Sequence, residues 1–140
     1  MKHSVEGKKV LVTGGTGFIG SGLVKGLLAA GAEVRSLDNN SRVAIARMDE
    51  GQRNVERITG DIRDTDTVRE AVRGMDCVCH LAYINGTESF YASPELVLEV
   101  AVKGMMNILD ACVSEESITL ESGANVIFRE PKFEIIFFEK

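Results

Sequence analysis

The chain has 140 residues, of which 44% are hydrophobic and 26% are charged. This length and composition allow one globular core and exclude two domains of typical size. The formal net charge of −5 does not favour a nucleic-acid partner, because phosphate backbones are held by clustered lysine and arginine side chains. A compact nucleotide is compatible with that charge, since backbone N–H groups at a helix N-terminus can hold phosphate.

The cysteines and the N-terminus indicate a cellular compartment. Cys77, Cys79 and Cys112 form no disulfide framework and no Cys-x-x-Cys pair, so they favour free thiols in a reducing cytoplasm over a metal site. The N-terminus has no apolar core of signal-peptide length, and no run approaches the ~18 apolar residues of a membrane-spanning helix. We expect a cytoplasmic protein with neither a metal nor a membrane partner.

The first half of the chain alternates apolar runs with helical patterns. Residues 9–13 are a short apolar run bounded by glycines and predict a strand. Apolar residues near helical spacing predict a helix over residues 18–30, and Gly31 stands where a C-terminal glycine is expected. Residues 33–37 predict a second strand, and turn-forming residues separate it from a short helix at residues 43–48.

The alternation continues in the second half. We predict a third strand at residues 55–59 and a helix at residues 64–72 that begins with an N-capping aspartate. Residues 76–82 are apolar apart from one histidine, as in a strand buried on both faces of a parallel sheet. A Ser-Pro pair then opens a long helix over residues 94–112. Four strand–helix repeats predict an α/β fold, a doubly wound parallel sheet with helices on both faces.

Beyond Val113 the pattern weakens. Residues 114–125 are polar and contain glycine, which predicts a connection. Residues 125–128 and 133–138 predict two strands that form a C-terminal β-hairpin. In the alternative interpretation, residues 126–128 are a fifth parallel strand.

The strongest local signal is the run Thr13-Gly14-Gly15-Thr16-Gly17-Phe18-Ile19-Gly20. It joins the first predicted strand to the first predicted helix, and it contains both a Gly-x-Gly-x-x-Gly and a Gly-x-x-Gly-x-x-Gly pattern. Glycines permit the sharp turn and let the backbone approach a pyrophosphate, while the helix N-terminus offers N–H groups and partial positive charge. The pattern predicts a dinucleotide site; the alternative is a tight turn without a ligand.

Two carboxylates at strand ends suit the adenosine half of a dinucleotide. Asp38 lies 18 residues after the last loop glycine, near the distance at which an acid binds the ribose hydroxyls and repels a 2′-phosphate. Arg42 opposes this preference, because a nearby arginine can accommodate a 2′-phosphate; NAD is favoured over NADP. Asp61 follows the third strand, where it could meet the adenine amino group. Both aspartates are alternatively turn or capping residues.

Together these segments resemble the extended short-chain dehydrogenase/reductase family, the NAD-dependent nucleotide-sugar epimerases and dehydratases. The matching segments are the TGGTGFIG loop, the acidic end of the second strand, GDIRD, an HLAA-like segment and a GTxNLLEA-like helix, at residues 13–20, 38–41, 60–64, 80–83 and 103–111. The resemblance implies a Rossmann fold that holds NAD, and a hydride-transfer cycle on a nucleotide sugar. It covers most of residues 1–113, and we expect the divergent tail, residues 114–140, to pack on the same domain.

The resemblance assigns cofactor contacts to the matching segments. These residues are Gly14, Gly15, Thr16, Gly17, Phe18, Ile19, Gly20, Asp38, Asn39, Asn40, Ser41, Arg42, Asp61, Ile62, Leu81, Ala82 and Tyr83. Among them Leu81 and Ala82 would form an apolar wall under the cofactor. A homodimer is a further expectation.

The chain departs from the family at the catalytic motif Tyr-x-x-x-Lys. Tyr83 and Tyr91 are followed four residues later by Thr87 and Glu95. In the family the tyrosine is the general acid/base, and the lysine lowers its pKa and holds the ribose. We therefore predict a chain that binds NAD and is catalytically incomplete without that motif and a substrate domain.

Two other functions stay open. A reduced but active enzyme could use His80, or a group from a second subunit, as its acid/base group, although a histidine within a strand is more often structural. A non-enzymatic fragment could self-associate through the apolar residues 135–138, since such segments pair at sheet edges. Glu88, Ser89 and Tyr91 are expected in a solvated loop.

Overall fold

The computed structural model describes residues 5–41, 54–84, 86–115, 119–122 and 126–128. One sheet forms its centre, with strands in the order β3-β2-β1-β4-β5-β6. The strands are β1 (Lys9–Thr13), β2 (Glu33–Asp38), β3 (Glu56–Thr59), β4 (Cys77–His80), β5 (Thr119–Ser122) and β6 (Val126–Phe128). Strands β1 to β5 pair in parallel, and β6 pairs antiparallel with β5.

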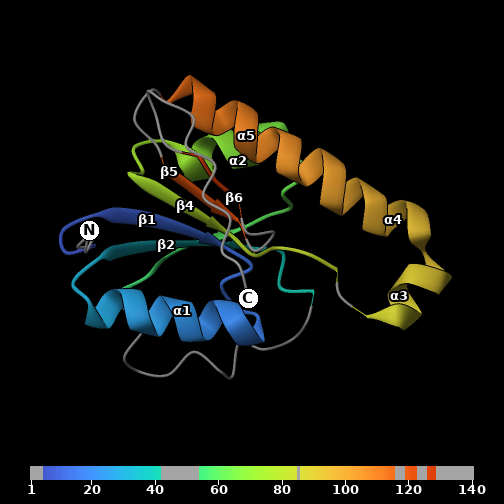
Figure 1. The fold of residues 1–140 in the computed structure, drawn as a ribbon, viewed down its shortest axis with the longest axis horizontal. Coiled ribbons are helices and arrows are strands. Elements are labelled where there is room, and N and C mark those ends of the chain that lie inside the picture. Colours follow the sequence, from blue (N-terminus) through green and yellow to red (C-terminus); the bar gives the residue numbers. More distant parts are fainter. Residues whose placement is uncertain (1–4, 42–53, 85, 116–118, 123–125, 129–140) are drawn as a thin grey trace.

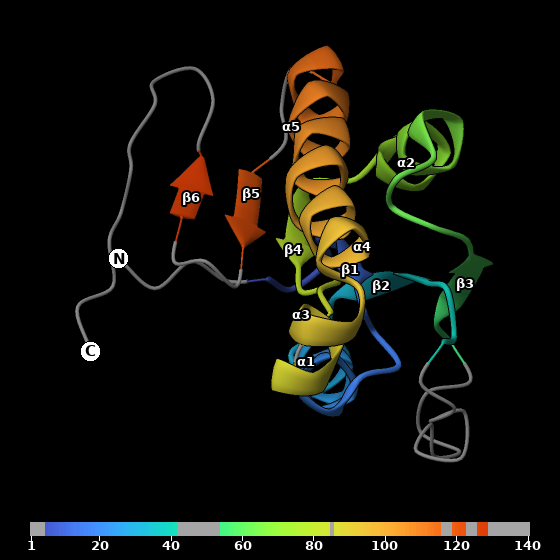
Figure 2. The same cartoon turned by 90° about the vertical axis from the view of Figure 1, so that its right-hand side faces the viewer.

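Helices cover both faces of this sheet. Helix α1 (Phe18–Ala29) lies on one face, whereas α2 (Thr65–Val72) and α5 (Gly104–Ser114) lie side by side on the other (Figure 1). Turned by 90°, the sheet runs between these two layers from β6 at one edge to β3 at the other (Figure 2). The structure therefore confirms the doubly wound α/β fold.

The central strand β1 is buried on both faces, which explains its unbroken apolar run. Val10 and Val12 pack with Val24 and Leu27 of α1. Leu11, which points to the opposite face, belongs to the cluster formed with α2 and α5. Successive side chains of a strand point to opposite faces, so one short segment contributes to both apolar layers.

The helix ends follow the predicted chemistry, with one exception. Gly31 adopts a φ of +84° directly after α1, a conformation that favours glycine. The Asp64 carboxylate accepts the N–H of Thr67 at 2.8 Å and caps α2. Pro94 is the first residue of α4 (Pro94–Leu98), as predicted, but the Ser93 side chain makes no capping bond. Helix α4 continues through a π-helical segment, η3 (Glu99–Lys103), into α5.

Several predicted elements are wrong. Residues 87–92 are not a loop: they form α3 (Thr87–Ala92), none of whose residues is buried. A fifth parallel strand exists, but it is β5, which lies within the residues predicted as a polar connection; residues 126–128 pair antiparallel beside it. Strand β5 is held by backbone hydrogen bonds to β4 and β6, so it needs no strong apolar pattern of its own.

Other expectations concern segments outside the described residues. These segments are the helix predicted at residues 43–48, the strand at residues 133–138 and the apolar segment at residues 135–138. Among the helices that the structure describes, none combines the length and apolar character needed to span a membrane.

Candidate functional site

The predicted cofactor residues gather at the carboxyl ends of the parallel strands. The register pairs Thr13 with Leu37 and with His80, and Asp38 with Thr59, so β1 to β4 end at nearly the same level. The chain order reverses at β1, which lies between β2 and β4. In open α/β sheets ligands bind at the carboxyl ends beside such a switch point.

The loop between β1 and α1 is compact because three of its glycines lie against other atoms. Gly14 has a φ of +73°, and a Cβ there would lie 2.9 Å from the backbone nitrogen of Ala82. A Cβ on Gly15 would collide with the Ser36 hydroxyl, and a Cβ on Gly20 would overlap the carbonyl of Gly14. Gly20 therefore lets the helix close against the loop itself.

Gly17 is the exception in this loop. Its φ of −67° and ψ of 173° suit any residue, and a Cβ would approach only the carbonyl oxygen of Gly14, at 3.2 Å. As the N-cap of α1, Gly17 offers no side chain to the N–H groups of the first helical turn. Phe18 and Ile19 beside it are 83% and 68% exposed, whereas Thr16 is buried. The helix N-terminus is thus left without a side-chain cap.

The Asp38 carboxylate joins the end of β2 to this loop. Its Oδ2 accepts the N–H of Thr16 at 3.0 Å, and its Oδ1 accepts the N–H of Asn40 at 2.8 Å. A carboxylate offers about four acceptor positions, so both oxygens can accept further hydrogen bonds. Asp38 is therefore both a turn residue and a candidate ligand of the ribose hydroxyls.

The residues after Asp38 form a hydrogen-bonded turn. Asn40 has a φ of 55°, and its Nδ2 donates to Thr59 Oγ1 at 3.2 Å. Asn39 accepts the N–H of Ser41 at 3.0 Å through its side-chain oxygen. Arg42 lies outside the described residues. The two asparagines therefore have structural roles whether or not they also contact a ligand.

Asp61 is held by an arginine that the sequence analysis gave no role. Arg63 donates from Nη2 to Asp61 Oδ2 at 2.7 Å, from Nε to both carboxylate oxygens, and from its backbone N–H to Oδ1 at 2.8 Å. Its Nη1 donates to Glu99 Oε2 at 2.7 Å. The side-chain hydrogen bond from Arg63 lowers the pKa of Asp61 despite partial burial. Asp61 is therefore an ionised hydrogen-bond acceptor.

Ile62 is held in place by the long helix, which consists of α4, η3 and α5. Its carbonyl accepts the Nδ2–H of Asn107 at 2.9 Å, and Asn107 Oδ1 accepts the Thr65 hydroxyl at 3.2 Å. Gly104 lets the helix approach, because a Cβ there would collide with the Ile62 side chain. Asn107 is not among the site residues predicted from the sequence, although a polar residue within an apolar helical pattern was a signal for it.

The connection after β4 is tied to the end of β1. The Thr13 hydroxyl oxygen accepts the N–H groups of Leu81 and Ala82, at 3.1 Å and 3.2 Å. His80 is 7% exposed, and burial lowers its pKa to about 4. His80 is therefore neutral at physiological pH and buried, which does not favour an acid/base role. Tyr83, which follows Ala82, is half exposed.

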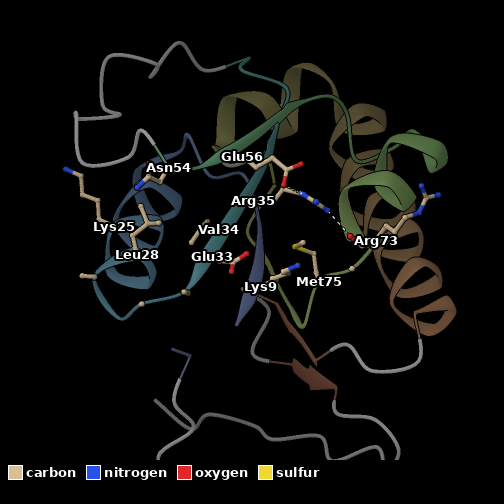
Figure 3. A pocket seen from close by; sticks show the side chains of 14 residues that line it. Lys9, Lys25, Leu28, Glu33, Val34, Arg35, Asn54, Glu56, Arg73 and Met75 are labelled. Atoms are coloured by element: carbon tan, nitrogen blue, oxygen red, sulfur yellow. Dashed lines mark hydrogen bonds and ion pairs between the residues drawn. The ribbon is translucent and has the colours of Figure 1, made fainter. Parts of the chain in front are cut away.

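An open cavity of about 990 Å³ lies at the amino ends of the strands, opposite the carboxyl ends that carry the candidate cofactor site (Figure 3). It includes the first residues of three strands, Lys9, Glu33 and Glu56, and none of the predicted cofactor residues. Its Arg35 is engaged, because Nε pairs with Glu56 at 2.8 Å and Nη1 donates to the carbonyl of Ala71 at 2.8 Å. The cavity is therefore separate from the candidate cofactor site.

The sheet order, the loop and the open helix N-terminus define an α/β protein of the Rossmann type. The sequence model of the 3-beta hydroxysteroid dehydrogenase/isomerase family matches residues 11–137. The chain belongs to this family, within the extended short-chain dehydrogenase/reductases, as the N-terminal Rossmann portion.

Individual relatives support this assignment. The chain is 36% identical over 130 residues to short-chain dehydrogenase/reductase family 42E member 1 of Danio rerio, covering 91% of this chain and 32% of that protein. It is 34% identical to the human 3 beta-hydroxysteroid dehydrogenase type 7, covering 81% and 32%. The NAD complex of Thermus thermophilus UDP-glucose 4-epimerase is 37% identical with a TM-score of 0.71, covering 80% and 36%. The chain thus spans about a third of the length of these proteins.

Proposed function

We propose that this chain binds NAD by its pyrophosphate and adenosine, as the cofactor-binding portion of an extended short-chain dehydrogenase/reductase. The observation that carries the proposal is Gly17. Its backbone conformation does not require glycine, and a Cβ would make one tight contact, 3.2 Å from the carbonyl oxygen of Gly14, rather than a collision. A ligand that closely approaches the backbone would account for the missing side chain. Phosphate at a helix N-terminus is such a ligand, because the N–H groups and the helix dipole attract negative charge.

The remaining cofactor contacts follow from the strand ends. Asp38 would accept hydrogen bonds from the adenosine ribose, and Asp61 would accept a hydrogen bond from the adenine amino group. Leu81 and Ala82 would form an apolar wall under the cofactor. The Asp38 carboxylate would repel a 2′-phosphate, which supports NAD over NADP. When bound, the cofactor supplies hydride-transfer chemistry, because its oxidised form accepts a hydride and its reduced form donates one.

The comparisons support a shared cofactor portion more strongly than any one substrate. One relative is named for a 3 beta-hydroxysteroid and another for UDP-glucose, yet both resemble this chain over only about a third of their length. Chemically different substrates with a common N-terminal third indicate that this third serves the cofactor. For a longer protein we propose a nucleotide sugar as the substrate, supported by the UDP-glucose 4-epimerase; a steroid alcohol is the competing class.

We propose binding without turnover for these 140 residues. Neither tyrosine is followed by a lysine four residues later, and the buried, neutral His80 offers no replacement acid/base group. The β5 and β6 strands extend the same sheet, which supports packing of residues 114–140 on this domain. Free thiols support a cytoplasmic location. Exposed apolar residues of the long helix support a homodimer; they are Leu98, Val102, Met106 and Val113.

Calorimetric titration of the purified chain with NAD tests the proposal through a substitution that preserves the fold. Gly17→Ser places a good N-cap at a position whose backbone already has N-cap geometry. The serine oxygen would occupy the N–H groups that phosphate needs, so we expect NAD affinity to fall by at least about tenfold, or ~1.4 kcal/mol. The variant should still unfold cooperatively on heating, which shows that the loss of affinity is not a loss of the fold.

The matched control is Gly22→Ala, within the same helix. A Cβ on Gly22 meets no atom within 4 Å, so this variant should bind NAD like the wild type. Absence of binding by the wild-type chain at millimolar NAD would refute the proposal. Equal NAD affinity in the wild type and in Gly17→Ser would show that the phosphates of NAD do not bind at the N-terminus of α1.

A further inference from the structure

Asp61 is the most heavily bonded carboxylate at the candidate site. Arg63 reaches it from Nε, Nη2 and its backbone N–H, with the shortest contact at 2.7 Å, between Nη2 and Oδ2. Glu99 accepts from the remaining arm of the same guanidinium, also at 2.7 Å. The planar guanidinium is thus held between two carboxylates, one from the loop after β3 and one from the long helix. A fork bound at both ends fixes the plane of the Asp61 carboxylate.

The acceptors on Asp61 are not all used. Oδ1 accepts the Arg63 backbone N–H at 2.8 Å, Oδ2 accepts Nη2 at 2.7 Å, and Nε is shared between the two oxygens at 3.0 Å and 3.1 Å. Three N–H groups thus serve about four acceptor positions, so one carboxylate oxygen can accept another donor. An ionised carboxylate can only accept hydrogen bonds, so this oxygen would favour an amino group over a carbonyl.

The long helix holds both sides of this loop. Glu99 begins the π-helical segment and binds Arg63, while Gly104, just past its end, lies against Ile62. Glu99 and Arg63 are 36 residues apart in the chain, so the orientation of Asp61 depends on the helix as well as on its own loop. Single π-helical turns are often found at functional sites.

We propose that Arg63, held by Glu99, is a positioning residue that makes Asp61 selective for the 6-amino group of adenine. This inference rests on the proposed NAD binding. Nicotinamide hypoxanthine dinucleotide is the appropriate probe, because it replaces that amino group with a carbonyl oxygen and leaves the phosphates and riboses unchanged. The ratio of its dissociation constant to that of NAD measures adenine selectivity independently of overall affinity.

The test is calorimetric titration of the full chain and its variants with both dinucleotides. The wild type should prefer NAD by at least about tenfold. Arg63→Lys keeps the charge but loses the planar fork, and Glu99→Ala removes the second anchor of the guanidinium. Both should reduce the preference to about threefold or less. Asp61→Asn should abolish it, because an amide can either donate or accept.

Glu95→Ala is the matched control, since it removes the same charge from an exposed position one turn earlier on the long helix. It should keep the wild-type ratio. The Glu99 side chain is 59% exposed, so we expect Glu99→Ala to fold. It therefore still tests the inference if Arg63→Lys fails to fold. Wild-type ratios in both variants, or an equal loss of affinity for both dinucleotides, would overturn the inference. A wild type that binds both equally would overturn it while preserving NAD binding, whereas no NAD binding would overturn both.

Discussion

Thr13 Oγ1 lies 2.7 Å from Nδ1 of His80, where β1 and β4 end side by side. The same oxygen accepts the N–H groups of Leu81 and Ala82. Its lone pairs are therefore occupied, so the hydroxyl hydrogen is donated to Nδ1 and the ring carries its own hydrogen on Nε2. This hydrogen bond requires a neutral His80, in agreement with its lowered pKa.

His80 should make the stability of the chain depend on pH. Burial lowers its pKa from 6.5 to about 4, so between these values the unfolded chain binds more protons than the folded chain. The stabilisation is complete above pH 6.5 and is lost as pH falls toward 4. We expect the free energy of unfolding to decrease by about 2 kcal/mol between pH 7 and pH 5 from this group, measured by urea denaturation.

His80→Asn is the control for this pH dependence. Asparagine can accept the Thr13 hydroxyl but does not titrate. The variant should lose this part of the change between pH 7 and pH 5. An unchanged pH dependence in His80→Asn would show that other groups are responsible.

Asn107 should be important for stability because its buried amide satisfies the carbonyl of Ile62. Asn107→Ala leaves that carbonyl without its donor, and we expect a loss of about 1–3 kcal/mol in the free energy of unfolding. Asn107→Asp should cost more, since a buried acceptor would face an acceptor. Met106→Ala, at a 57% exposed position beside it, should change stability by less than about 0.5 kcal/mol. Equal effects at both positions would argue against the amide's role.

Gly26 should be replaceable with a gain in stability. It lies within α1, and a Cβ there would meet no atom within 4 Å. Alanine loses less conformational entropy on folding, so Gly26→Ala should raise the free energy of unfolding by about 0.5–1 kcal/mol. Thermal denaturation followed by circular dichroism measures this, and NAD titration should show unchanged affinity. A lower melting temperature would contradict the exposed position of Gly26.

Asp38 should determine the preference between the two dinucleotides. Asp38→Asn keeps an oxygen for the Thr16 or Asn40 N–H but removes the negative charge that would repel a 2′-phosphate. We expect the wild type to bind NAD more tightly than NADP, and the variant to lose at least about threefold of that preference. Separate titrations with NAD and NADP give the ratio. A wild-type preference for NADP would contradict the assigned role of Asp38.

Local sequence patterns predicted the first six elements of the described fold, from β1 to β4, because the packing of each depends on residues that are close together in the chain. The apolar run of β1, the helical spacing of α1 and the position of Gly31 each depend on a few neighbouring side chains. Strand β5 and helix α3 escaped prediction for the opposite reason. Thr119–Ser122 becomes a strand by pairing with β4, and Thr87–Ala92 has no buried face that would produce an apolar period.

From the sequence alone, the glycine loop, its place between strand and helix, and the acidic strand ends could be recognised, since spacing along the chain is enough to define them. Tertiary structure decided the partners. Thr13 meets His80 across 67 residues, and Arg63 meets Glu99 across 36. Only the packing of strands and helices brings such groups within hydrogen-bonding distance. Only atomic positions distinguish Gly17, where a Cβ would make one tight contact of 3.2 Å, from Gly15 and Gly20, where a Cβ would collide with other atoms.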